Sequence, residues 1–428
     1  MTPAGTGVMG ITERRAVEHP RCSGHPANKL RNRLINRGFA RGMPRSHGLR
    51  RTHFRDESHW EGYAQSSIGA GRSIPVVASC SPRLPPVGEP TKLKILPQSL
   101  PPNAESWRCR RRSPLEILDL RHFSSVDLRP LLDDETQLWS RLLSWDYSGS
   151  AGMILRYVDA KILPGYAAVD RGRVFGYSFF VYEGSKGVIG DLYVTNGSRL
   201  PNAREVELKL LTHVIETLQQ SPGIHRVEAQ LLAHEANAVS RPFLETGFQR
   251  HPRLFMVLTM GKTAPEKAPP HPDVEIRPWT EGDYQPSAAV ITAAYRGHVD
   301  AQINDQYHTL SGSLRFLNNI VRFPGCGVFD AESSFVALDR RSKSVIGLIL
   351  CSRVRNDVGH VTQVCVLPEY RSRHIGESLL AATVANLQKR GFSMLSLTVT
   401  EANARAVALY RRLDFDTKRI FDAFVWEG

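Results

Sequence analysis

A basic turn in front of a helix is the part of this chain best suited to hold an anion. The segment "VCVLPEYRSRHIGESLL" (364–380) reads as a strand that ends at a proline, a short turn, and a helix with apolar residues on one face. Backbone N–H groups point outward at a helix N-terminus and bind phosphate oxygens there. Arg371 and Arg373 add guanidinium donors that suit phosphate. The turn, with Gly376 at its end, therefore predicts an anion site.

Together with a later segment, this turn resembles the GNAT superfamily of acyl-CoA-dependent N-acyltransferases. The family's turn is R/Q-x-x-G-x-G/A and wraps the pyrophosphate of acetyl-CoA. The later segment, "NARAVALYRRLDF" (403–415), follows a predicted strand at 394–400 and resembles the family's "N…A..LY…GF" element. The matching residues are Asn403, Ala406, Leu409, Tyr410 and Phe415. The resemblance covers residues 274–428 well and residues 113–262 in outline, and it indicates fold and cofactor rather than acceptor.

The resemblance implies acetyl-CoA as co-substrate, no metal, and a role for each matching residue. The turn would supply backbone amides to the pyrophosphate. The splayed strand at 364–366 would hydrogen-bond the pantetheine arm and polarise the acetyl carbonyl. Asn403 would contact the pantetheine, and Tyr410 would protonate the departing CoA thiolate. The residues expected to bind acetyl-CoA are Val364, Cys365, Val366, Arg371, Ser372, Arg373, His374, Ile375, Gly376, Glu377 and Asn403.

The family mechanism is direct attack by a neutral amine, for which a general base is useful. In the histone-acetyltransferase branch, a glutamate base lies four residues before the splayed triplet, and here that position is His360. A histidine titrates near neutrality, so His360 is the candidate base; the alternative is a polar residue on a strand. In the ribosomal-protein acetyltransferase branch the base is a glutamate on the next strand, where this chain has Thr398.

Two residues depart from the family pattern. His374 replaces the first glycine of the turn, and Asp414 replaces the glycine of "GF". Glycine permits positive φ and close approach of the backbone to a ligand. If the turn requires either property, His374 weakens CoA binding, whereas its ring could instead add a hydrogen bond to phosphate.

The first half of the chain carries an imperfect copy of the second. "EANA" occurs at 235–238 and at 401–404. Four weaker matches keep the same order: "LEI" (115–117) with "VEI" (274–276), "VFG" (174–176) with "VIG" (345–347), "DLYV" (191–194) with "QVCV" (363–366), and "GF" (247–248) with "DF" (414–415). Matches in order at nearly constant spacing predict a duplication with small loop insertions.

The copies differ in their chemistry. "TNGSRLPNAREVELKLL" (195–211) has no R-x-x-G-x-G pattern, and Pro201 interrupts the turn. Phe243 stands five residues before Phe248, where Tyr410 stands five before Phe415. A phenyl ring cannot donate a proton. The first half is therefore predicted to be a degenerate copy that packs against the second or helps to shape it.

The alternation of strands and helices predicts an α+β (α/β-like) fold of two tandem GNAT-type domains. Each would be a mixed, mostly antiparallel sheet flanked by helices. In the second half we predict strands at 334–339, 344–354, 360–366 and 394–400. The domains would span residues 113–262 and 274–428, joined by the Pro-rich linker "TAPEKAPPHPD" (263–273).

The net charge of +13 comes from one segment. Residues 1–112 hold 20 Lys and Arg against 7 Asp and Glu, out of 55 and 42 in the whole chain. This Arg-, Gly- and Pro-rich segment has no sustained apolar period, which predicts a disordered extension or a start assigned too far upstream. An RNA-binding arm and an organellar transit peptide are the alternatives. The remaining chain is electrically neutral, so we expect neither a nucleic-acid partner nor a membrane partner.

Several classes of protein do not fit this sequence. None of its six cysteines forms a CxxC pair, so neither a zinc ribbon nor a disulfide framework is indicated. No apolar run approaches the roughly 20 residues of a membrane span, and an apolar signal-peptide region is missing from the first thirty residues. We expect a cytoplasmic protein, and the sequence does not indicate its oligomeric state.

We predict an N-acetyltransferase acting on a primary amine of a small molecule or of a peptide or protein N-terminus. The alternative is a non-catalytic acyl-CoA-binding or protein-interaction module. The acceptor itself is not readable from the sequence. The segment at 296–313 is expected to form the lip of the acceptor site, where Asp300 and Asp305 are candidates to hold a cationic amine.

Overall fold

The computed structural model describes residues 115–195, 202–261, 271–322, 325 and 327–428. The predictions for residues 1–112, for the turn around Pro201 and for most of the linker at 263–273 lie outside these residues. In the described part of the chain no helix has the length and apolar character that a membrane crossing requires.

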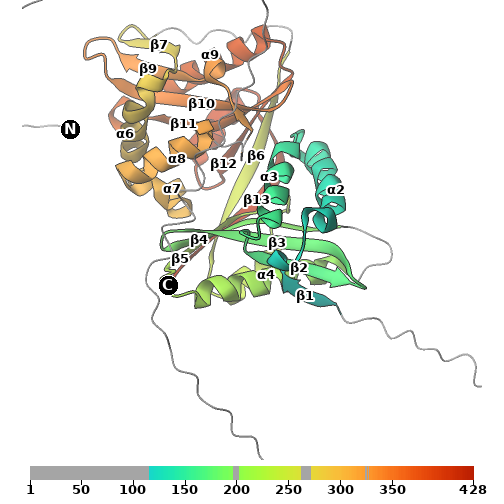
Figure 1. The fold of residues 1–428 in the computed structure, drawn as a ribbon. Coiled ribbons are helices and arrows are strands. Elements are labelled where there is room, and N and C mark those ends of the chain that lie inside the picture. Colours follow the sequence, from blue (N-terminus) through green and yellow to red (C-terminus); the bar gives the residue numbers. More distant parts are fainter. Residues whose placement is uncertain (1–114, 196–201, 262–270, 323–324, 326) are drawn as a thin grey trace, which may run out of the picture. The chain divides into compact units, whose positions relative to one another are not determined.

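The first half contains six strands and three long helices among its described elements (Figure 1). Its strands are β1 (Glu116–Asp119), β2 (Gly165–Asp170), β3 (Arg173–Glu183), β4 (Lys186–Val194), β5 (Arg226–Gln230) and β6 (Gln249–Thr259). Its helices are α2 (Ser125–Leu143), α3 (Ser148–Asp159), α4 (Ala203–Gln220) and the short α5 (Ser240–Glu245).

The second half follows a similar order of elements. Its strands are β7 (Val274–Pro278), β8 (Val328–Phe329), β9 (Phe335–Asp339), β10 (Val345–Arg355), β11 (Val358–Val366), β12 (Met394–Thr400) and β13 (Asp416–Glu427). Its helices are α6 (Tyr284–Ala294), α7 (Val299–Ile303), the 3-10 turn η3 (Asp305–His308), α8 (Leu310–Arg322), α9 (Ile375–Lys389) and α10 (Ala404–Arg412). The strands predicted at 334–339, 344–354, 360–366 and 394–400 correspond to β9 to β12.

The described strands form one sheet in the order β1-β2-β3-β4-β5-β13-β6-β12-β11-β10-β9-β7, with β8 beside β10. The pairs β4–β5 and β11–β12 are parallel. The other neighbours are antiparallel. The run β1 to β5 therefore pairs in the same order as the run β7, β9, β10, β11 and β12.

The two halves exchange their last strands. β13, which ends the second half, pairs with β5 of the first half, and β6, which ends the first half, pairs with β12 of the second. β6 and β13 also pair with each other, so the two runs of strands become one sheet (Figure 1). The prediction of two separate sheets is therefore wrong on this point. The pattern of residues along a strand indicates which side chains are buried, but it does not indicate which other strand the strand pairs with.

Helices cover both faces of the sheet in each half. Neighbouring residues of β2 point to opposite sides: Ala167 packs with α2 and α3, and Ala168 packs with α4. In the second half α9 lies on one face, and α6 and α8 lie on the other. The apolar face predicted for α9 is buried, which confirms that helix, and Gly391 follows its end at φ +81°.

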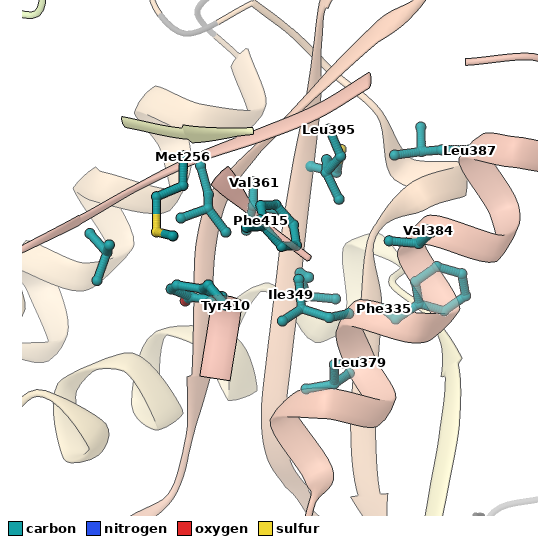
Figure 2. Close-up of a cluster of buried hydrophobic side chains, with 14 of the residues drawn as sticks. Met256, Phe335, Ile349, Val361, Leu379, Val384, Leu387, Leu395, Tyr410 and Phe415 are labelled. Atoms are coloured by element: carbon teal, nitrogen blue, oxygen red, sulfur yellow. The ribbon is translucent and has the colours of Figure 1, made fainter. Parts of the chain in front are cut away.

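The core around α9 contains a residue from the first half. Met256 of β6 lies with Tyr410, Phe415 and Val361 in one buried cluster (Figure 2). Met256 is fully buried. The first half therefore completes the core of the second, and the two share their hydrophobic stabilisation.

Candidate active site

β11 and β12 run in parallel and then separate. Their pairing extends from Val358 opposite Met394 to Val361 opposite Leu397. On its other edge β11 stays paired with β10 as far as Val366, opposite Gly347. Residues 362–366 consequently have no strand partner on the β12 side, as predicted for a splayed strand. Backbone groups on that edge are available to a ligand.

A cavity of about 830 Å³ lies at this separation. All the predicted site residues except Arg373 line it. They are His360, Val364, Cys365, Val366, Arg371, Ser372, His374, Ile375, Gly376, Glu377, Asn403 and Tyr410. The guanidinium of Arg373 instead lies 5.2 Å from the ring centre of Tyr370. The fold therefore brings residues from β11, α9, β12 and α10 to one cavity.

The turn before α9 has the backbone conformation that favours glycine. Ser372 and His374 have φ of +64° and +59°, and α9 begins directly after His374. A side chain in this conformation costs roughly 1–2 kcal/mol. Nδ1 of His374 lies 3.0 Å from Oε2 of Glu377, which also accepts a hydrogen bond from Arg412. The substitution of glycine by His374 thus strains the backbone, and the pairing with Glu377 offsets part of that strain.

Asp414 sits at a second position of the same kind. Its φ is +61°, whereas Gly247, after α5 in the first half, has φ +86°. Asp414 is exposed, so Asp414→Gly is expected to raise the free energy of unfolding by about 0.5–1 kcal/mol. Gly247→Asp should lower it by about 1 kcal/mol or more, although a Cβ there meets only Trp426 at 3.9 Å. Urea unfolding of both variants tests this, and a change of the same sign in both would contradict it.

Tyr410 presents a protonated phenol to the cavity. It lies on α10 and is only 6% exposed. Burial, and to a lesser extent the charge of Asp300, raises the pKa of Tyr410 well above its ordinary range. Asn403 begins the same helix; its Oδ1 accepts from the backbone N–H of Ala406, and its Nδ2 lies 3.3 Å from Nε2 of His298. At neutral pH Tyr410 can therefore donate a proton.

The surroundings of His360 oppose its predicted role as a base. It is 4% exposed, and Nδ1 lies 3.0 Å from Oγ of Ser396. Its ring packs edge-on against Trp145 at 4.7 Å, with Phe255 at 6.3 Å, and both neighbours belong to the first half. Burial, together with the charge of Arg253, lowers the pKa of His360 to about 3. A neutral imidazole with this pKa is a poor proton acceptor near pH 7.

His360→Gln is expected to remove a pH dependence of stability. Between the ordinary pKa of 6.5 and the folded value of about 3, the unfolded chain binds a proton that the folded chain does not. Stability therefore falls as the pH drops below about 6.5, by up to about 1.4 kcal/mol per pH unit. Urea unfolding between about pH 7 and pH 4.5 should show a shallower fall for the variant. Parallel curves for both proteins would contradict the assignment.

Of the two predicted acids of the lip, one reaches the cavity. Asp300 on α7 lines it, accepts a hydrogen bond from the Thr400 hydroxyl, and lies 3.4 Å from Nδ1 of His298. Asp305 instead accepts a hydrogen bond of 2.6 Å from Lys186 of β4. Asp300 is therefore positioned to meet a ligand, and Asp305 ties the lip to the first half.

The first half holds this lip through buried charges. Glu228 of β5 accepts from the backbone N–H of Asp305 at 3.2 Å, and from Arg226 at 2.6 Å. Arg226 also donates to the carbonyl of Gln302 at 2.5 Å. The side chains of Lys186, Arg226 and Glu228 are 6%, 10% and 8% exposed. The prediction that the first half helps to shape the second agrees with these contacts.

In the first half, β4 and β5 separate in a similar way, and side chains of the chain pack beside them. β4 and β5 pair from Lys186 to Ile189 and then separate. Nε2 of His234 donates a 2.8 Å hydrogen bond to the carbonyl of Leu192 in the separated part of β4. Phe243 is fully buried and stacks on Phe424 of β13, with ring centres 4.1 Å apart. One carbonyl of the separated part of β4 is thus already hydrogen-bonded, and Phe243 packs in the buried core that also contains Leu192.

Among the cavity residues that sequence reasoning missed are Gln230 on β5 and Arg253 on β6. Both belong to the first half. Arg253 lies opposite Thr400 because β6 pairs with β12. No pattern along the chain indicates this neighbour, because it depends on the exchange of the last strands.

Comparison with protein families supports an acetyltransferase at the level of the family. Residues 303–415 match the model described as the Acetyltransferase (GNAT) family. A mycothiol acetyltransferase from Thermobifida fusca is 35% identical over 97 residues, 21% of this chain and 30% of that protein. The Escherichia coli [ribosomal protein bS18]-alanine N-acetyltransferase is 36% identical over 64 residues, 15% of this chain and 43% of that protein. The chain thus spans less than half the length of these curated relatives.

A solved structure extends the similarity of fold to both halves. The GCN5-related N-acetyltransferase from Sphaerobacter thermophilus superposes with a TM-score of 0.53 at 16% identity. The alignment covers 73% of this chain and 95% of that one. At this identity the likeness concerns the fold alone.

Proposed function

We propose that this protein is an N-acetyltransferase that moves the acetyl group of acetyl-CoA to a primary amine in the cavity between β11 and β12. One observation carries the proposal: a buried phenol, an unpaired strand edge and a helix N-terminus with an adjacent arginine line the same cavity. In this reading residues 113–262 and 274–428 are tandem copies, and the first has lost its own site.

Acetyl-CoA would lie along the separated strand with its pyrophosphate at the start of α9. The N–H groups of the first turn of α9 attract phosphate. Arg371 and Arg405 add positive charge at this end of the cavity, and Nη2 of Arg405 donates to Oγ of Ser372 at 2.5 Å. The edge of Val364–Val366 would hydrogen-bond the pantetheine arm. A cavity of about 830 Å³ has room for the reacting end of the donor and for an acceptor.

In the reaction, the amine nitrogen forms a bond to the acetyl carbon, and the carbon–sulfur bond of the thioester breaks. Tyr410 would give its proton to the departing thiolate, the nitrogen of the new amide would lose a proton to solvent, and Tyr410 would be reprotonated from solvent. The attacking amine must be neutral. His360 is unsuited to take its proton, so we assign Asp300 to hold the ammonium form and receive the proton through water.

A non-catalytic acyl-CoA-binding module is the alternative, and the lining of the cavity favours the enzyme. A binding module has no use for a proton donor at the end of the pantetheine channel, and Tyr410 supplies one. The first half instead has Phe243 in the corresponding place of its sequence, and a phenyl ring cannot donate a proton.

Titration of the full chain with acetyl-CoA, followed by thiol-release assays on a broad panel of amines, tests the proposal. We expect one acetyl-CoA per chain and release of free CoA with at least one class of amine. Binding without turnover on the whole panel would favour the non-catalytic module. A stoichiometry of two would contradict the loss of the first site.

A further inference from the structure

Arg253 on β6 is a partly buried cation that faces the cavity without an anionic partner. Its Nη1 donates to Oε1 of Gln230 at 2.5 Å, and its Nε is buried with no hydrogen bond. Within the described chain it forms no ion pair with Asp or Glu inside 4.0 Å. By contrast, Arg226 and Arg390 each have a carboxylate, at 2.6 and 2.8 Å. An arginine that lines a cavity and has no carboxylate partner is suited to bind an anionic ligand there.

The exchanged strands place Arg253 at the cavity, between β12 and β13. Arg253 lies opposite Thr400 of β12 on one side and opposite Phe421 of β13 on the other. Its guanidinium carbon is 6.0 Å from the ring centre of Phe421. Thr400 in turn donates to Asp300. Thr400 therefore neighbours one positively and one negatively charged residue.

The charge of Arg253 acts across the site. It contributes to the lowered pKa of His360 after the larger effect of burial, and to that of His251 after burial and the charge of Arg226. Asp300 contributes to the raised pKa of Tyr410. Asp300 and Arg253 therefore both lie at the cavity that Tyr410 lines.

We infer that Arg253, supplied by the first half, binds the carboxylate of an acceptor that carries both an amine and a carboxylate. This rests on the proposed function and narrows its acceptor to amino acids and related amino-carboxylates. The N–H groups of a guanidinium form charge-assisted hydrogen bonds with carboxylate oxygens. In Arg253, Nε is buried and Nη1 is held by Gln230, which leaves Nη2 for the ligand. The first half then contributes specificity to a reaction whose chemistry lies in the second.

The test compares amino acids with their carboxamides as acceptors for the full chain. The probes are glycine, alanine, phenylalanine and glutamate, each as the free acid and as the α-carboxamide. Charge-assisted hydrogen bonds discriminate by about 10- to 100-fold, so we expect kcat/KM for the acids to exceed that for the amides by this factor. Arg253→Gln should bring the ratio close to one and leave the Kd of acetyl-CoA unchanged. Arg253→Lys should give an intermediate ratio.

Arg250→Gln is the matched control, because Arg250 lies exposed on the same strand and hydrogen-bonds Asn237. It removes the same charge from β6 and should keep the wild-type preference. Equal kcat/KM for acids and amides in the wild type would overturn the inference and leave the acetyltransferase intact. Circular dichroism shows whether each variant folds. If Arg253→Gln does not fold, Arg253→Lys is used in its place.

A binding measurement separates this inference from the proposed function. N-acetylphenylalanine and its carboxamide are titrated calorimetrically into the chain saturated with CoA. Tighter binding of the acid, lost in Arg253→Gln, supports the carboxylate site even if no amine is turned over. Failure of both compounds to bind, or equal binding of both, overturns it.

Discussion

Tyr410→Phe is expected to lower kcat for acetyl transfer by about 10²-fold, with the Kd of acetyl-CoA within a few-fold of wild type. The phenyl ring keeps the packing against Phe415 and deletes the hydroxyl alone. Without a proton donor, CoA must leave as an unprotonated thiolate. Pre-steady-state measurement of the chemical step, beside calorimetric titration of acetyl-CoA, checks both expectations.

The raised pKa of Tyr410 has a second consequence. The phenol stays protonated through neutral and mildly alkaline pH. At any pH below about 10, deprotonation of Tyr410 should therefore cause no loss of kcat. Tyr182→Phe is the control, because Tyr182 is exposed on the first half and hydrogen-bonds Ser221. Wild-type turnover in Tyr410→Phe while chemistry is rate-limiting would show that the proton comes from elsewhere.

Glu228→Ala is expected to destabilise the protein by about 3–5 kcal/mol, since it leaves buried cations without their shared partner. Glu228 contacts Arg226 and Lys186, and it accepts from the backbone of Asp305 in the lip. The loss should therefore appear in two measurements. Urea unfolding should show the lower free energy, and KM for the amine should rise because α7 and η3 are no longer anchored.

Glu245→Ala is the matched control for that variant. Glu245 pairs with Arg241 at 2.9 Å, but both side chains are more than half exposed. An exposed pair of this kind contributes about 0.5 kcal/mol or less. A loss below about 1 kcal/mol in Glu228→Ala would mean that the lip is held by other contacts, such as that between Lys186 and Asp305.

The sequence by itself determined the local features of the site. The turn before α9 could be predicted because a turn and the helix start that follows it depend on a few consecutive residues. The same holds for α9, whose buried face follows from residue spacing. The difference between Phe243 and Tyr410 is likewise a difference in residue type, visible without a structure. Each of these depends on interactions within about one or two turns of chain.

The tertiary structure alone decided which groups meet in the cavity and how they are charged. His360 has the residue type of a base, but Trp145 and Phe255, from far along the chain, remove its water and lower its pKa. Arg253 reaches the cavity because β6 pairs with β12 rather than with β5. Backbone donors and acceptors are the same in every strand, so the local sequence does not determine which strand pairs with β6. That pairing depends on how much apolar surface both halves bury together, which is set only in the folded chain.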